Sequence, residues 1–198
     1  MHEYSLSHHD RKNVYYLAAV VSGSLGVGIA YIIGILQISY GIAIAAPSGL
    51  AVFGLLFLAF DNFVWKWPIL YQMGLVKIPN LNGLWNAEIT SSQGGVGIGA
   101  KINIYQTYSK IRIRLETDKS HSFSQMATLE MADPTCFHLR YEYSAEYQRD
   151  QNAEILRHYG VTCLRLKSMD HKFSTSQSAS YYTEQGRDSH GTLILKKE

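Results

Sequence analysis

A long stretch rich in hydrophobic residues and free of charge occupies residues 13–60. Between Lys12 and Asp61 there is no Asp, Glu, Lys or Arg. A bilayer core about 30 Å thick is crossed by about 20 helical residues, so this stretch predicts two spans, at about residues 14–38 and 42–64. The prediction is a transmembrane helical hairpin within residues 1–79. A buried core helix is the alternative, although such helices rarely run past twenty residues without a charge.

From about residue 80 the pattern changes to a period of two, which is typical of β-strands with one buried face. In the segment "KIRIRLET", for example, Ile111, Ile113 and Leu115 alternate with charged residues. Short polar turns separate the segments. The pattern predicts strands at about residues 84–90, 100–108, 110–117, 120–131, 135–147, 157–168, 172–183 and 191–197.

Eight antiparallel strands in chain order favour an up-and-down β-barrel, because closure removes free strand edges. The predicted fold is therefore a membrane-anchored all-β protein, with a cytoplasmic eight-stranded barrel over residues 80–198. A two-layer sandwich is the alternative, but it usually needs a longer crossover connection than any seen here.

The alternation also predicts which side chains face the inside of this barrel. The apolar set, which fills the end near residue 80, is Trp85, Ile102, Ile104, Ile111, Ile113, Leu115, Leu139, Leu164, Leu166, Leu193 and Leu195. The same parity gathers a polar and aromatic set at the opposite end: Ser122, Ser124, Tyr141, Tyr143, His158, Thr162 and Tyr181. An apolar base with a polar, aromatic mouth is typical of a small-molecule pocket. A β-bulge in any strand would reverse part of this assignment.

Charge and motifs narrow the possible functions. Residues 81–198 carry 14 Lys and Arg against 13 Asp and Glu, so the basic surface typical of proteins that bind polymeric nucleic acid is absent. Arg187, in the last hairpin, is a candidate partner for a phosphate group. No metal-ligand spacing and no nucleophile motif occurs, so we expect no catalytic residue, no metal and no enzymatic activity. Cys136 and Cys163 lie in strand-like segments and are interpreted as small buried hydrophobic residues.

The apolar segment contains two further signals. Small residues recur every fourth position, at Ser22, Gly26, Ala30 and Gly34, which lets a second helix approach closely and predicts self-association or packing against the other span. Positive charges flank the hairpin on its outer sides, at Arg11, Lys12, Lys66 and Lys77. The positive-inside rule therefore predicts a multi-pass protein with both termini in the cytoplasm.

Several short stretches resemble one protein family. They are "LNGLW" at 81–85, "SHSFS" at 120–124, "LRYEY" at 139–143, "HYG" at 158–160 and "YYTEQGRDSHGTLIL" at 181–195. Together with the preceding apolar segment, their order is similar to that of the membrane effectors of bacterial cyclic-oligonucleotide-based antiphage signalling (CBASS).

The resemblance implies a function. The barrel would bind a cyclic dinucleotide as its activating ligand, without any other cofactor. The membrane helices would then assemble in the lipid bilayer and disrupt the bacterial inner membrane, which causes abortive infection. Two alternatives stay open: a membrane-tethered carrier or sensor of lipids or other small molecules without killing activity, and an interaction module whose barrel is filled.

Overall fold

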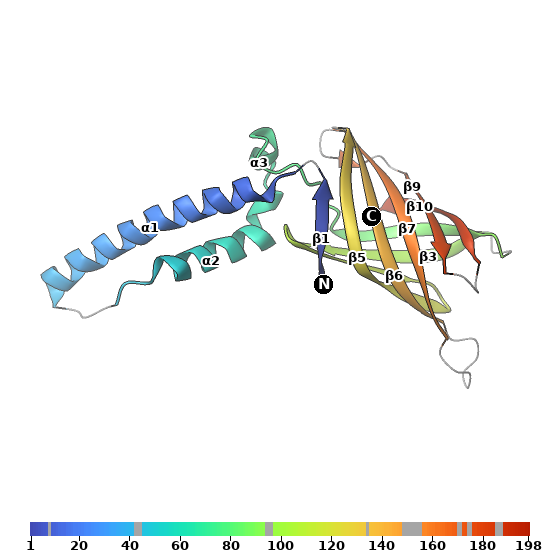
Figure 1. Cartoon of the computed structure of the whole chain (residues 1–198), viewed down its shortest axis with the longest axis horizontal. Helices are drawn as coiled ribbons and strands as arrows, with labels where there is room; N and C mark the ends of the chain where they lie inside the picture. The colour runs from blue at the N-terminus through green and yellow to red at the C-terminus, as the bar shows by residue number, and fades with distance from the viewer. Residues whose placement is uncertain are drawn as a thin grey trace. The chain divides into compact units, whose positions relative to one another are not determined.

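A computed structural model describes residues 1–7, 9–41, 45–93, 97–133, 135–147, 156–169, 172–173, 176–184 and 188–198 (Figure 1). The chain divides into two units, one formed by Met1–His8 with Pro79–Glu198 and the other by His9–Ile78. The sequence assigned residues 1–79 to a helical hairpin. The first eight residues belong instead to the β-sheet unit, because they include a strand that pairs within the sheet.

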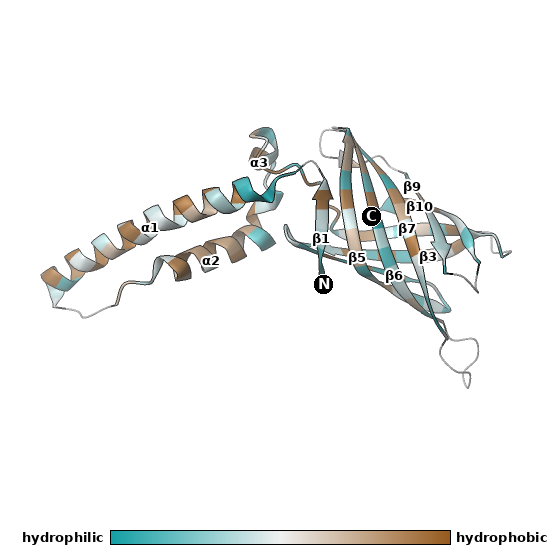
Figure 2. Ribbon diagram, in the orientation of Figure 1, coloured by the Kyte–Doolittle hydropathy of each residue, from teal (hydrophilic) through white to brown (hydrophobic). Residues whose placement is uncertain are grey.

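Helix α1 spans Arg11–Tyr40, and its length and composition are sufficient to cross a bilayer. The Asp10 carboxylate caps its first turn by accepting a hydrogen bond from the Lys12 N–H at 2.9 Å. The helix ends at Gly41, whose φ of 66° lies in the left-handed region that glycine adopts without strain. Figure 2 shows hydrophobic residues along most of α1 and of the next helix.

The second span expected at 42–64 is shorter in the structure. Helix α2 spans only Gly49–Asn62, and Ser48 caps it by accepting a hydrogen bond from the Ala51 N–H at 3.2 Å. Fourteen residues make about 21 Å of helix, which is less than the thickness of a bilayer core. The short helices η1, Val64–Lys66, and α3, Pro68–Gln72, follow it. Among the described residues, one helix and not two is therefore long enough to span a membrane.

The two long helices of this unit pack against each other. The rings of Tyr15 and Phe57 meet edge to face, with centroids 5.3 Å apart. A Cβ added at Gly26 would lie 3.7 Å from the Cα of Gly49, so the two backbones approach closely where α2 begins. Ser22 is buried, and its hydroxyl donates to the carbonyl of Ala19. Of the small-residue stripe, Gly26 thus faces the second helix of the same chain.

The other two members of the stripe are placed differently. Ala30 is exposed, and a Cβ added at Gly34 would meet no atom within 4 Å. These two positions therefore leave part of α1 open to another helix.

The β-sheet unit contains the strands that the alternation predicts. They are β2 (Gly83–Ser91), β3 (Ile98–Gln106), β4 (Lys110–Glu116), β5 (Ser120–Asp133), β6 (Cys136–Tyr147), β7 (Leu156–Met169), β9 (Gln177–Thr183) and β10 (His190–Lys197). The segment predicted at 172–183 contains two strands, because the two-residue β8 (Lys172–Phe173) precedes β9 and, within the described part of the chain, pairs with β7.

The antiparallel pairings among these strands form a closed circuit, in which the last strand pairs with the first. Each strand from β2 to β7 pairs with the next, β7 pairs with β9, β9 with β10, and β10 pairs back to β2. We call this closed circuit of eight strands the strand ring. Its pairings follow the up-and-down order expected from the sequence, and they join one continuous sheet and not the two sheets of a sandwich.

One strand of the unit was not predicted. β1, His2–Ser7, lies between β4 and β5 and pairs antiparallel with the former and parallel with the latter. Its alternation is too short to be distinguished from a polar tail by pattern alone, since only Tyr4 is fully buried.

The core of the strand ring lies at the end where the chain enters β2. All the predicted apolar interior residues are buried except Leu115, which is partly exposed, and two of them, Leu115 and Leu193, lie toward the opposite end of the ring. Tyr4 helps to close the end where the chain enters β2, because its hydroxyl donates to the Tyr108 carbonyl at 3.1 Å and accepts from the Gln106 amide at 3.2 Å. The Gln106 side chain in turn accepts a hydrogen bond from the Leu81 N–H at 2.8 Å.

Candidate functional site

A cavity of about 570 Å³ opens at the opposite end of the strand ring. Eight strands contribute to its wall, each through residues near the same end of the ring. The lining residues are Ile89, Ser91, Gln93, Ile98, Leu115, Thr117, Asp118, Lys119, Ser120, Ser122, Tyr141, Tyr143, Ala145, His158, Thr162, Tyr181, Thr183, Ser189 and Leu193.

The structure brings six of the eight predicted ligand-binding residues together in this wall. They are Ser122, Tyr141, Tyr143, His158, Thr162 and Tyr181. Alternating strand direction brings Ser122 and His158, near the start of β5 and β7, to the same end of the ring as Tyr181, near the end of β9. Tyr141 and Thr162 pair with each other near the middle of β6 and β7. Arg187 lies outside the described residues.

Ser124 does not line the cavity, although it was predicted together with Ser122. Its hydroxyl accepts a hydrogen bond from the Ile113 N–H at 2.9 Å and lies 2.8 Å from Nε2 of His2. The β5–β6 register shifts between Ser124 and Met126, so an additional residue, Gln125, stands at a bulge. Before the bulge the even-numbered residues of β5 face inward, and beyond it the odd-numbered Ala127 and Leu129 do. This is the reversal of faces that was expected for a bulge in any strand. Ser124 is thus a structural residue of the strand junction.

Three aromatic residues form a continuous part of the cavity wall. The rings of Tyr141 and Tyr143 have centroids 6.3 Å apart, and the His158 ring meets Tyr143 edge to face at 6.4 Å. Burial raises the pKa of the Tyr141 hydroxyl to about 12, and a hydrogen bond with Thr162 opposes that rise. The hydroxyl therefore stays neutral at physiological pH and can both donate and accept hydrogen bonds.

Two glycines set the positions of the tyrosine rings. Gly160 pairs with Tyr143 across the β6–β7 ladder, and a Cβ there would lie 2.4 Å from the Tyr143 hydroxyl oxygen. Gly191 pairs with Tyr181 across the β9–β10 ladder, and a Cβ there would lie 2.7 Å from the Tyr181 ring. Each ring lies over a position without a side chain, which a glycine alone provides.

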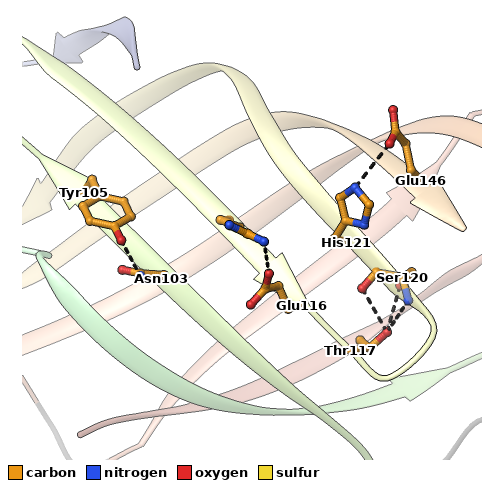
Figure 3. A network of polar contacts seen from close by, with 8 residues as sticks. Asn103, Tyr105, Glu116, Thr117, Ser120, His121 and Glu146 are labelled. Atoms are coloured by element: carbon orange, nitrogen blue, oxygen red, sulfur yellow. Dashed lines mark hydrogen bonds and ion pairs between the residues drawn. The ribbon is translucent and has the colours of Figure 1, made fainter.

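The sequence prediction missed the turn between β4 and β5, residues 117–120, which forms the rim of the cavity. The Thr117 hydroxyl oxygen accepts a hydrogen bond from the Ser120 N–H at 3.0 Å and lies 2.9 Å from the Ser120 hydroxyl (Figure 3). It also accepts a hydrogen bond from the Lys119 N–H at 3.3 Å. These bonds hold a compact turn and leave Asp118 and Lys119 exposed at the mouth. The polar sequence "TDKS" joins two predicted strands, where a turn is expected. Strand alternation does not extend into a turn, so it could not assign these residues to the cavity.

The outer face of the strand ring carries a separate polar cluster. The Glu146 carboxylate accepts one hydrogen bond from Arg157 at 2.5 Å. It also lies 3.2 Å from Nε2 of His121 (Figure 3). Hydrogen bonding from Arg157 is the main cause that lowers the pKa of Glu146. None of these three residues lines the cavity, and among the described residues no group of three or more His, Cys, Asp or Glu is placed to hold a metal ion.

Comparison with known proteins identifies the family of this cavity-containing unit. Residues 76–197 match the family model described as Cap15, cyclic dinucleotide receptor domain. The CD-NTase-associated protein 15 of Yersinia aleksiciae is 30% identical over 139 residues, which are 70% of this chain and 64% of that protein. The chain thus matches less than two thirds of the length of this relative. The family match contains β2 to β10 and every residue that lines the cavity. The chain therefore belongs to the family of Cap15 cyclic dinucleotide receptor domains.

Proposed function

We propose that this chain is a membrane-bound CBASS effector whose strand ring is a β-barrel receptor for a cyclic dinucleotide. Ligand binding promotes self-association of the membrane helices, and the assembled helices disrupt the inner membrane of the infected bacterium. The observation that carries the proposal is the cavity of about 570 Å³, walled by tyrosines and hydroxyl groups, inside the unit that matches the receptor family.

The size and lining of the cavity support a small polar, aromatic ligand. Its volume lies within the range of about 300–1,000 Å³ that is typical of small-molecule sites. Tyrosine faces can stack on nucleobases, and such stacking contributes about 1–3 kcal/mol per base. The hydroxyls of Ser122 and Thr162 and the ring of His158 lie on the same wall and can bond base edges or ribose. A fatty-acid carrier would need a more uniformly apolar lining.

The distribution of charge supports one orientation of the ligand. Among the described lining residues, Lys119 is the one Lys or Arg, and it lies exposed at the rim. A phosphodiester is a strong acceptor that pairs with a cationic side chain. In the proposed complex the bases therefore enter between the tyrosines, and the phosphates stay near the mouth and Lys119.

The helical unit supplies the proposed membrane attachment. α1 is long enough to cross a bilayer, and α2 packs beside it as a shorter apolar helix. The receptor unit faces the cytoplasm in this proposal, because the messenger is made there. A ligand shifts an equilibrium only through different affinities for the two states. The cyclic dinucleotide must consequently bind the assembly-competent state more tightly than the dispersed one.

A binding and sizing experiment on the full chain tests the proposal. The protein is purified in detergent and mixed with a panel of 3′,3′- and 2′,3′-linked cyclic dinucleotides, with a linear dinucleotide and a fatty acid as controls. We expect one cyclic dinucleotide to raise the melting temperature and to increase the particle size. At a ligand concentration 100 times the dissociation constant, binding adds about 2.7 kcal/mol to the free energy of unfolding. Leakage of dye from lipid vesicles then tests membrane disruption. No melting shift with any cyclic dinucleotide would remove the receptor function.

A further inference from the structure

The N-terminal strand β1 occupies a gap in the strand ring. β4 and β5 pair directly at only three positions, where Arg114 to Glu116 face His121 to Phe123. Beyond these pairs the two strands separate. β1 fills the space, with His2 and Glu3 paired to β4 and residues 4–7 paired to β5. We call this the seam.

One hydroxyl group organises the point where β4 and β5 separate around β1, which we call the fork. Ser124, at the bulge of β5, accepts a hydrogen bond from the Ile113 N–H of β4 and lies 2.8 Å from Nε2 of His2 in β1. Three strands therefore meet at this side chain. Two residues before it along β5, Ser122 lines the cavity. A change in the cavity wall at Ser122 is thus adjacent to the point where β1 is attached.

β1 is short and held by few anchors. Tyr4 is its one fully buried residue, with hydrogen bonds to Tyr108 and Gln106. Ser5 lies beside Thr128 of β5, with the two hydroxyl oxygens 2.8 Å apart on the exposed face. Segments with few buried apolar contacts open at a lower free energy than the core of the same domain. β1 therefore has the properties of an element that can open by itself.

The strand is also joined closely to the long helix. Three residues, 8–10, separate the last residue of β1, Ser7, from the first residue of α1, Arg11. A connection this short cannot absorb a large displacement. A seated β1 therefore tethers the start of α1 to the β-sheet unit through a short covalent connection.

We propose that β1 is a separately opening seam strand that couples occupancy of the cavity to α1. The coupling part rests on the proposed function of the cavity, whereas separate opening does not. Ligand contact at the wall formed by Ser122 and the neighbouring 117–120 turn changes the fork at Ser124. The change shifts the balance between β1 seated in the seam and β1 released, and release frees α1 to associate with other copies.

Hydrogen exchange of the full chain in detergent tests separate opening. We expect the amides of residues 4–7 to exchange at least about tenfold faster than those of Ile102 and Ile104 in β3, which open with the core of the ring. Because the proposal has the ligand favour release of β1, we expect a bound cyclic dinucleotide to increase the exchange rate of the β1 amides further. Equal exchange rates for β1 and β3 would show that the strand opens only with the whole unit, which overturns the proposal.

A disulfide lock tests the coupling. Ser5→Cys with Thr128→Cys, in a background with Cys136→Ser and Cys163→Ser, joins β1 to β5 at a position where the native oxygens already lie 2.8 Å apart. We expect the oxidised protein to bind the dinucleotide but to lose ligand-driven self-association, and reduction to restore it. The matched control is Ser180→Cys in the natural sequence, which can join Cys163 across the β7–β9 ladder, away from the seam. This control should assemble normally when oxidised.

The outcomes separate the two proposals. If the oxidised seam lock binds ligand and assembles like its reduced form, the coupling is wrong while the receptor function stands. If no cyclic dinucleotide changes the melting temperature of the reduced proteins, the receptor function and the coupling are both overturned, and the exchange rates alone decide whether β1 opens separately.

Discussion

Gly160 lies directly opposite Tyr143 in the β6–β7 ladder, and the tyrosine ring covers the place where a Cβ would stand. The two residues come from different stretches that resemble the CBASS family, "HYG" and "LRYEY". Their pairing means that the position of a cavity tyrosine depends on the absence of a side chain across the ladder. The position of the Tyr143 ring can therefore be changed by a mutation at Gly160, without a mutation of Tyr143 itself.

Gly160→Ala should push the Tyr143 ring from its position and change the cavity. The added Cβ would also lie 2.7 Å from the Tyr182 carbonyl oxygen, so we expect a loss of about 1–3 kcal/mol in stability and weaker dinucleotide binding. Calorimetric titration and thermal unfolding measure the two effects. Gly99→Ala is the matched control, because a Cβ at this strand glycine meets no atom within 4 Å. Equal affinity for the two variants would contradict this role of Gly160.

Ser122 and Ser124 should respond differently to the same substitution. Ser122→Ala removes a cavity hydroxyl, so we expect affinity to fall about two- to tenfold with little change in melting temperature. Ser124→Ala leaves the buried Ile113 N–H without its acceptor, so we expect a loss of about 1–3 kcal/mol in stability. Ligand titration and chemical unfolding distinguish the pair. The assignment is wrong if Ser124→Ala is the variant that keeps full stability.

The raised pKa of Tyr141 predicts a loss of stability at alkaline pH. Between its ordinary value of 10.0 and about 12, the unfolded chain loses the tyrosine proton while the folded protein keeps it. Tyr141 therefore contributes about 2.7 kcal/mol to the free energy of unfolding below pH 10, and this contribution is lost as the pH rises through 12. Tyr141→Phe should remove that part of the decline. The check is the free energy of unfolding of both proteins at pH 9 and pH 11.5, and parallel declines would refute the prediction.

Lys119 should contribute to affinity through charge. Lys119→Gln removes the one Lys or Arg among the described cavity residues, so we expect about three- to tenfold weaker dinucleotide binding and a smaller dependence of affinity on salt. Lys101→Gln is the control, because Lys101 is an exposed lysine of β3 outside the cavity. Titrations at low and high salt test both variants. An unchanged salt dependence for Lys119→Gln would place the phosphates elsewhere.

The contact between the helices of the membrane unit can be tested with two neighbouring glycines. Gly26→Leu places a large side chain where the α1 and α2 backbones approach, whereas Gly23→Leu points to open space. We expect only Gly26→Leu to lower the thermal stability of the helical signal in detergent, because small residues permit close packing of membrane helices. Circular dichroism measures this signal. Equal effects of the two substitutions would argue against the packing of α1 on α2.

Local sequence patterns were sufficient to predict most of the sheet and much of the cavity. Side chains on a strand alternate between two faces, so strand positions, the buried set and six cavity residues followed from the order of amino acids. The long charge-free stretch likewise predicted helix α1, because the span expected at about 14–38 lies within Arg11–Tyr40, but it predicted a second full span where the structure has the shorter α2.

Other features depended on contacts between residues that are distant in sequence. β1 joins the sheet because β4 and β5 separate at the bulge, and Ser124 turns to bonds with Ile113 and His2 for the same reason. The 117–120 turn becomes part of the cavity only because the strands around it close into a ring. A six-residue strand or a four-residue turn carries too little pattern to reveal its partners, since these are chosen by pairing geometry and not by local alternation.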